Sequence, residues 1–269
     1  MTDRYAKYKK LTFLRPSENV LEIVLNGVGK GNACDHDAHA EMSSVWLDVG
    51  ADPDVNCAII RGPGDAFCSG GYAGGLGDFR EDYNRVILGW GEVRGIVFNM
   101  INCSKPIVSA VRGPPAGAGL AMALLADISI TSETARINDA HSKIGMVAGD
   151  HAAIIWPLLC SMARAKLHLF LNDTLTGKEA YDLGLFSMCV ADDQVYDSAR
   201  ATAVRLAACA QTPIRWTKYV MNNWLRANST NFDLSASLAT LSLLGPDNKE
   251  GMKAFKEKRK PVFTTKSTL

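Results

Sequence analysis

The stretch "VRGPPAGAGLAMALLAD" at residues 111–127 decides the interpretation of this sequence, because it places three glycines and two prolines immediately before an apolar segment. It follows a strand pattern at 105–113 and leads into "LAMALLAD", which favours a helix. Gly117 and Gly119 permit a tight or left-handed backbone and let a ligand approach the main chain. Because the first turn of a helix has unpaired N–H groups, the stretch predicts amides that face a ligand. The alternative is a pair of tight turns that serve close helix packing.

A second glycine-rich stretch, "FCSGGYAGG" at 67–75, precedes the first. One amide donor from each stretch, both aimed at the same oxygen, would form an oxyanion hole. A phosphate loop is a poorer interpretation, because G-x-x-x-x-G-K-[ST] is absent and "GAGLAM" does not meet the spacing G-x-G-x-x-G.

Composition argues for a globular protein and against several classes of partner. Of the 269 residues, 47% are hydrophobic and 21% are charged, and the net charge is +1. This balance does not favour a nucleic-acid or membrane-surface binder. The seven cysteines are scattered without a C-x-x-C pair, so neither a disulfide framework nor a zinc site is expected. The N-terminus lacks a signal-peptide pattern, and no window has the ~18 apolar residues of a membrane span, so we expect a cytoplasmic protein.

The pattern along the chain predicts an α/β core followed by a helical segment. A helix is expected at 37–52, and the pattern is helical after about residue 150. The expected domains are a core over 1–200 and a C-terminal helical segment over 201–269. Strands are expected at "NVLEIVLNG" (19–27), "NCAIIRG" (56–62), "KPIVSAVRG" (105–113) and "ISITSETARIN" (128–138).

Six ordered motifs cover nearly the whole chain: "GNACDHDAHAEM", "AFCSGGYAGG", "KPIVSAVRGPPAGAGLAMALLAD", "TSETARINDAHSKIGMVAGD", "LTGKEAYDLGLF" and "DNKEGMKAFKEKRKPVF". Together they resemble the crotonase superfamily, the enoyl-CoA hydratase/isomerase family. The resemblance implies a ClpP/crotonase-like spiral of ββα units with a helical C-terminal segment. It also implies homotrimers or homohexamers, and an acyl-CoA thioester whose enolate is held in an oxyanion hole. Coenzyme A is then part of the substrate, and no tightly bound cofactor or metal is expected.

The resemblance assigns binding roles to particular residues. The matching oxyanion-hole donors are the N–H groups of Gly71 and Ala118. The C-terminal "AFKEKRKPVF" matches the segment that closes over CoA, and its basic residues, including Lys256 and Lys258, suit CoA phosphates. A solvated basic tail is the alternative. The segments that contact the adenine and pantetheine groups match Asn32, Ala33, Cys68 and Gly70.

Two departures from the family pattern decide the chemistry. Hydratases of this family use two glutamates, but the first position is occupied here by Ala121 and the second by His141. Asp150 stands where some relatives place a catalytic aspartate, and His39 is on a helix that borders the pocket in the family. A histidine titrates near neutral pH, and a nearby carboxylate would orient it, so a His–Asp pair is expected to be a general base for water.

Each of these residues has a structural alternative. His39 would then be a polar residue on an exposed helix face, and Asp150 would cap the helix that begins at "HAAIIWP". His151 and His168 are expected to be structural. Metal binding by His36, His39 and His141 is poorly supported.

Three functions remain open. The first is hydration of an acyl-CoA thioester, or hydrolytic cleavage of a C–C bond in a β-oxo acyl-CoA. The second follows from His39, His141 and Asp150, which together resemble the β-diketone hydrolase branch of the 6-oxocamphor hydrolase type; these enzymes do not need CoA. The third is a scaffold that has lost its activity. The segment 78–100 is expected to cover the acyl pocket, where Tyr72, Trp90 and Phe98 suggest a bulky or cyclic substrate.

Overall fold

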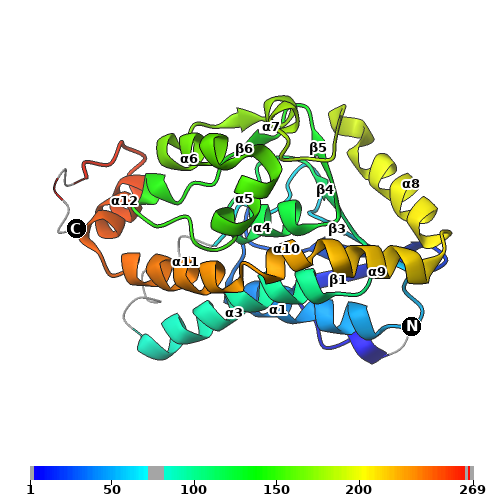
Figure 1. Ribbon diagram of the computed structural model, residues 1–269. Helices are drawn as coiled ribbons and strands as arrows, with labels where there is room; N and C mark the ends of the chain where they lie inside the picture. Colours follow the sequence, from blue (N-terminus) through cyan, green and yellow to red (C-terminus); the bar gives the residue numbers. More distant parts are fainter. Residues whose placement is uncertain (1–2, 72–81, 264–265, 267–269) are drawn as a thin grey trace.

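The computed structural model describes residues 3–71, 82–263 and 266 (Figure 1). Short 3-10 turns occupy η1 (Asp3–Tyr5), η2 (Ser142–Ile144) and η3 (Asp192–Gln194). The strands are β1 (Leu11–Ser17), β2 (Val20–Leu25), β3 (Cys57–Arg61), β4 (Ile107–Val111), β5 (Ile128–Ser132), β6 (Arg136–Ile137), β7 (Leu175–Thr176) and β8 (Met188–Val190). The helices are α1 (His36–Ala51), α3 (Tyr83–Asn102), α4 (Ala118–Leu125), α5 (Ala152–Cys160), α6 (Met162–Leu171), α7 (Gly177–Leu183), α8 (Val195–Ala207), α9 (Gln211–Met221), α10 (Asn223–Arg226), α11 (Ser229–Ser242) and α12 (Pro246–Lys256).

The main sheet has the strand order β1-β2-β3-β4-β5-β8. β1 is antiparallel to β2, and each later neighbour is parallel. Every residue of β2 and β4 is buried, as is typical of parallel strands covered on both faces. The expected α/β class and the strands at 19–27, 56–62, 105–113 and 128–138 are therefore confirmed as β2, β3, β4 and β5.

Alternate residues of the strands point into two separate hydrophobic clusters, because successive side chains of a strand lie on opposite faces. On one face, Ile59 and Val108 pack with Val195 and Ala199 of α8. The opposite face, which includes Ile60, packs against α1, α3, α4 and α5. Figure 1 shows α8 alone at one side of the sheet, with the other helices gathered on the opposite side.

The secondary structure of the C-terminal half differs from its expected form in two places. β8 adds a strand in the region expected to be helical after residue 150. The helical run 152–171 divides into α5 and α6 at Ser161, whose φ of 75° breaks the helix. Residue 200 lies inside α8, so the expected division between 1–200 and 201–269 falls within a helix that packs on the main sheet. Beyond it, α9, α10 and α11 run back along α3 (Figure 1).

All seven cysteines are free thiols, and five of them are buried. Among the described residues, no helix is both long enough and apolar enough to cross a membrane.

Candidate active site

The two glycine-rich stretches pack backbone against backbone. The amide of Ala116 donates to the carbonyl oxygen of Cys68 at 3.0 Å. A Cβ at Gly119 would overlap that same carbonyl, so only glycine fits there. Gly117, with φ at 48°, turns the chain into α4, and the helix starts at Ala118 as expected. The small residues therefore allow two chain segments to come together at the start of a helix.

Among the described residues, two main-chain amides at this junction have no backbone acceptor. Ala118 is the first residue of α4, where no intrahelical acceptor exists, and it is half-buried. Gly71, which is exposed, follows Gly70, whose carbonyl oxygen accepts from Cys34 at 2.8 Å. Within residues 3–71, 82–263 and 266, neither Gly71 nor Ala118 donates its N–H to a backbone carbonyl. Both groups are consequently available to an oxygen outside the chain.

A cluster of side chains in which carboxylates and imidazoles alternate lies beside this junction. His141 Nδ1 is 2.9 Å from Asp139 Oδ1, and His141 Nε2 is 3.7 Å from Asp150 Oδ2. The other oxygen of Asp150 accepts from His151 Nδ1 at 2.6 Å. A Cβ at Gly117 would lie 3.9 Å from Asp150 Oδ2, which places that oxygen next to the turn before Ala118. Acid–base groups and unpaired amides thus occupy one region.

Attraction between opposite charges determines the protonation states of His141 and Asp150. Burial disfavours the cationic form of His141, but Asp139 and Asp150 outweigh it and raise the pKa of His141 to about 10. Burial also opposes the ionised form of Asp150, and His151 and His141 outweigh it and hold the pKa of that carboxyl well below its usual range. At neutral pH, therefore, His141 is an imidazolium and Asp150 is a carboxylate.

The last two helices support the turns that carry His141 and Asp150. Asn248 of α12 donates to the carbonyl oxygen of Ile144, in the 3-10 turn that follows His141. Ser235 of α11 donates to the carbonyl oxygen of Gly149 at 3.0 Å. A Cβ at Gly149 would overlap the backbone of α11, so this contact is close. The C-terminal segment is consequently part of the wall behind the site.

His39 belongs to a second histidine–carboxylate cluster, between α1 and α3. Its Nδ1 is 2.6 Å from Glu92 Oε2, and His36 Nδ1 is 3.9 Å from Glu92 Oε1. The exposed fraction of the His36 side chain is 40%, against 11% for His141. In the described part of the chain, His39 pairs with neither Asp139 nor Asp150, so the structure does not unite the three predicted catalytic side chains.

The residues expected to contact CoA are not equally accessible. Asn32 is 3% exposed, and its side chain bonds to the backbone of Gly27, Leu25 and Phe67. Cys68 and Gly70 are also buried, and Ala33 is half-buried. These four residues can therefore offer a ligand mainly their backbone, while Lys256 and Lys258 are exposed at the end of α12 and beyond it.

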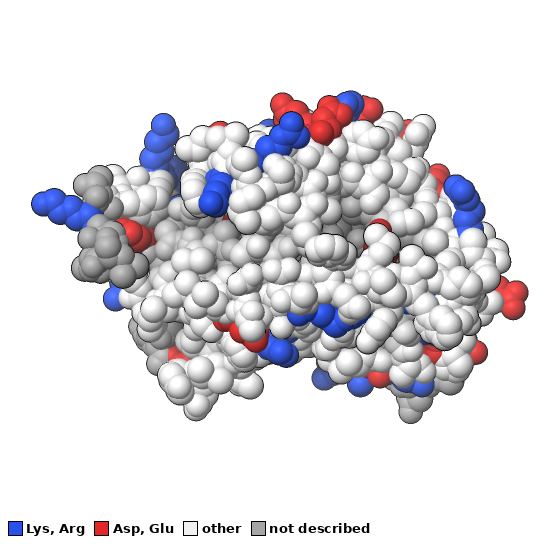
Figure 2. All heavy atoms as spheres, viewed as in Figure 1, with Lys and Arg blue, Asp and Glu red and all other residues white. Residues whose placement is uncertain are grey.

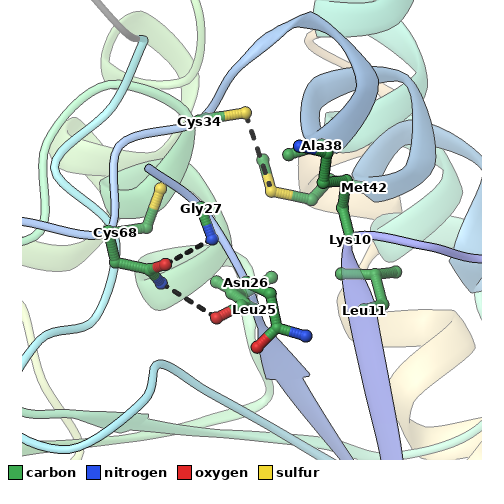
Figure 3. A pocket seen from close by; sticks show the side chains of 10 residues that line it. Lys10, Leu11, Leu25, Asn26, Gly27, Cys34, Ala38, Met42 and Cys68 are labelled. Carbon is green, nitrogen blue, oxygen red and sulfur yellow. Dashed lines mark hydrogen bonds between the residues drawn. The ribbon is translucent and has the colours of Figure 1, made fainter. Parts of the chain in front are cut away.

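A small cavity of about 10 Å³ lies next to Asn32 and Cys68. Figure 3 shows Cys34, Met42 and Lys10 around it, with the Cys34 thiol directed at the Met42 sulfur. A cavity of this size holds about one water molecule. It is a packing gap under the expected CoA segment, and it is too small for an acyl group.

Of the residues expected to line the acyl pocket, Tyr72 lies outside the described residues. Trp90 is half-buried on α3, which forms within the expected segment 78–100. Phe98 packs edge-on against Phe232 of α11, with ring centroids 5.1 Å apart. Its ring therefore contributes to helix packing.

Two further residues of this histidine–carboxylate cluster, Asp139 and His151, have no functional role in the sequence-based prediction. The spacing D-x-H at 139–141 and the pair D-H at 150–151 are the only sequence signals that point to them. The N-cap residue of α5 is His151, whose side chain makes no capping hydrogen bond, while Asp150 Oδ1 accepts from the backbone N–H of His151 just before the helix.

In the part of the chain that the structure describes, one group has the composition and spacing of metal ligands. Ligand atoms of Asp139, Asp150 and His151 lie within 4.8 Å of one another. The imidazolium of His141 is paired with both carboxylates, so it balances one of their two negative charges. His36, His39 and His141 do not form such a group there.

The chain matches a family model and many related proteins along nearly its whole length. The model described as enoyl-CoA hydratase/isomerase matches residues 15–266. A 1,2-epoxyphenylacetyl-CoA isomerase of Escherichia coli (strain K12) is 28% identical, over 93% of this chain and 96% of the relative. An (E)-benzylidenesuccinyl-CoA hydratase of Thauera aromatica is also 28% identical, over 93% and 97%.

Solved structures agree with these matches. The crystal structure of an enoyl-CoA hydratase/isomerase from Mycobacterium paratuberculosis has a TM-score of 0.86 and 29% identity, and covers 91% of this chain and 97% of that one. A β-diketone hydrolase from the cyanobacterium Anabaena sp. PCC 7120 has a TM-score of 0.82, with 93% and 98% coverage, and at 24% identity it supports the fold alone. The fold is thus the expected crotonase fold, and the chain belongs to the enoyl-CoA hydratase/isomerase family.

Proposed function

We propose that this enzyme adds water across the double bond of an α,β-unsaturated acyl-CoA thioester, with Asp150 and His141 in place of the family's two glutamates. The observation that carries the proposal is the oppositely charged pair of His141 and Asp150 beside the turn at Gly117. The N–H groups of Gly71 and Ala118 would hold the thioester oxygen, since preorganised amides stabilise an enolate.

The proposed reaction balances with these groups. Asp150 takes a proton from water as the water oxygen bonds to Cβ of the substrate, and the electrons of the double bond move into the thioester enolate. The imidazolium of His141 then gives its proton to Cα, and the enolate returns to a thioester. The proton on Asp150 passes to His141 Nε2, 3.7 Å away, which restores both groups.

This assignment revises the expected role of His141. A general base must be unprotonated, but the pKa of His141 is raised to about 10, so at neutral pH it carries a proton to give. Asp139, which accepts from Nδ1, would leave Nε2 directed at the reacting atoms. Asp150 is then the base and His141 the acid.

We place CoA along the segments that matched the family motifs. The backbone of Asn32, Ala33, Cys68 and Gly70 would contact its adenine and pantetheine groups. Lys256 and Lys258 would approach its phosphates, because exposed ammonium groups attract phosphate as point charges.

A β-diketone hydrolase is the second candidate, and one observation favours it. The His141 imidazolium and the two amides are separate oxyanion donors, so the site could polarise two carbonyl groups at once. Water activated by Asp150 would attack one carbonyl, and the bond between the two carbonyls would break with an enolate as the leaving group. That enolate would take its proton from His141.

A substrate panel distinguishes the candidates. Turnover of enoyl-CoA thioesters, including ones with aromatic acyl groups, is followed by the loss of their ultraviolet absorbance, and cyclic β-diketones are tested by product analysis. Calorimetric titration with CoA adds a binding test. We expect hydration and measurable CoA binding; cleavage of diketones without CoA binding would support the second candidate. No turnover by a correctly associated protein would support an inactive scaffold.

We also propose that the chain forms a homotrimer or homohexamer in the cytoplasm. Over α10 and α11, the face in Figure 2 is mainly uncharged. Large exposed apolar patches mark interaction surfaces, and free thiols suit a reducing compartment. The side chains at issue, each at least 60% exposed on α9 to α11, include Trp216, Tyr219, Trp224, Leu234 and Leu241.

A further inference from the structure

His151 is a buried histidine that the proposed reaction does not use. Its side chain is fully buried, and its Nδ1 donates to Asp150 Oδ1 at 2.6 Å. Its Nε2 is buried and, among the described residues, has no hydrogen-bond partner. A buried polar atom without a partner destabilises a fold, whereas an apolar side chain at this position would carry no such cost. The histidine therefore calls for an explanation other than packing.

The contacts of His151 determine which oxygen of Asp150 is free. Oδ1 accepts from two donors of the same residue, the ring Nδ1 and the backbone N–H, the latter at 2.8 Å. The other oxygen, Oδ2, is 3.7 Å from His141 Nε2 and lies next to Gly117. The two bonds thus fix the rotation of the carboxylate and turn Oδ2 toward His141 and the unpaired amides.

Among the described residues, the ring of His151 is the only side chain that donates to Asp150 Oδ1. The ring therefore adds to the restraint that the backbone N–H places on this oxygen. The backbone N–H alone would hold Oδ1 with a single bond and leave the carboxyl free to rotate. Because buried charge-assisted bonds are strong, a second donor at 2.6 Å restrains that rotation.

We propose that His151 is a positioning residue: it holds Asp150 through Oδ1 so that Oδ2 faces the substrate and the imidazole of His141. The proposal rests on the proposed function of Asp150 as the base. His151 does not touch the substrate in this arrangement; it acts through the geometry of its neighbour.

Two matched substitutions test the role of the ring nitrogen. His151→Asn places an amide N–H near the position of Nδ1, and His151→Gln places it near the position of Nε2. We expect H151Q to lower kcat about ten- to a hundredfold with KM changed less than about twofold, as for the loss of one charge-assisted bond. H151N should restore most of kcat. The acid limb of the pH–rate profile should move to higher pH in H151Q, because Asp150 loses a donor that favours its ionised form.

Wild-type kcat and pH profile in H151Q would overturn the proposal, as would equal impairment of H151N and H151Q when both unfold at the wild-type temperature. A second readout does not depend on turnover: the carboxyl-carbon NMR titration of Asp150, assigned with D150N. We expect Asp150 to titrate at higher pH in H151Q than in H151N, and identical titrations would contradict the role of the ring. Absence of any wild-type turnover would instead remove the proposed function, while this titration would still decide the His151–Asp150 link.

Discussion

The molecule contains two clusters in which histidines meet carboxylates, and they differ mainly in their neighbours. Between α1 and α3, His39 and His36 share the single carboxylate of Glu92; His36 is exposed, while the side chains of His39 and Glu92 are 19% and 15% exposed. Before α5, His141 lies between two carboxylates, with side-chain exposures of 11% for His141 and 13% for Asp150. The number of carboxylates per histidine therefore distinguishes the two clusters more than burial does.

This difference supports the proposal that the His141 cluster, and not the His39 cluster, carries the acid–base chemistry. Two carboxylates beside one imidazole stabilise a cation next to an anion at neutral pH, and charges interact more strongly where water is excluded. The His141 cluster also lies beside amides that, among the described residues, have no backbone acceptor. In the other cluster, the Glu92 carboxylate lies 2.6 Å from His39 Nδ1 and joins α1 to α3.

The largest effect is expected from Asp150→Asn, which removes the proposed base but preserves the shape of the side chain. kcat/KM for hydration should fall about 10²–10⁴-fold. Glu92→Gln is the matched change in the other cluster and should alter kcat/KM less than about threefold. Steady-state kinetics on one enoyl-CoA substrate measures both. Equal losses in the two variants would show that the clusters do not differ in function.

A somewhat smaller effect is expected from His141→Gln, because water or Asp150 can still supply a proton slowly. kcat should fall about 10²–10³-fold. His39→Gln, the corresponding change on α1, should stay within about threefold of wild type. If H39Q lost as much activity as H141Q, the sequence-based prediction of a catalytic His39 would be restored.

Asp139→Asn should lower kcat about ten- to a hundredfold, because His141 would keep a hydrogen-bond partner at position 139 but lose the negative charge of that partner. In wild type the rate should remain steady through neutral pH and decline as pH approaches about 10, where His141 loses its proton. Without the Asp139 carboxylate, the pKa of His141 should fall, so the alkaline limb should move to lower pH. An unmoved limb in the pH–rate profile would assign that limb to another group.

The smallest effect is one on stability. The pKa of His141 is raised on folding from 6.5 to about 10, so its stabilising contribution is complete below pH 6.5 and is lost as pH rises toward 10. The free energy of unfolding should fall in this window with a slope of at most about 1.4 kcal/mol per pH unit. Urea unfolding at several pH values measures it. H141Q should lose this part of the slope and H39Q should keep it.

Local patterns predicted much of the fold, and the family motifs supplied the candidate residues of the site. β2, β3 and β4 were predictable because each is a short run rich in β-branched residues with Gly, Asn or Pro nearby, and α4 because Gly117 directly precedes a run of helix formers. β8 was missed because three residues carry too short a pattern, and the break at Ser161 depends on a left-handed backbone that no glycine signals. His141 and Asp150 followed from the family motifs.

The partners of these two residues could not be predicted in the same way. Asp139 and His151 gain their roles from contacts across a turn of the folded chain. The association of His39 with Glu92 joins residues on two different helices. Spacing suggests which residues are near in sequence, but the direction of each side chain depends on the packing of the helices around it.

The hydrogen bonds from Ser235 to Gly149 and from Asn248 to Ile144 tie the final helices to the turns that carry the proposed catalytic residues. Neighbouring copies that dock on the exposed leucines of α11 would press on the same helix that supports the loop before Asp150. Subunit assembly and turnover would then be coupled mechanically. Substitutions in α11 or α12 would then change the reaction rate without changing any side chain that contacts the substrate.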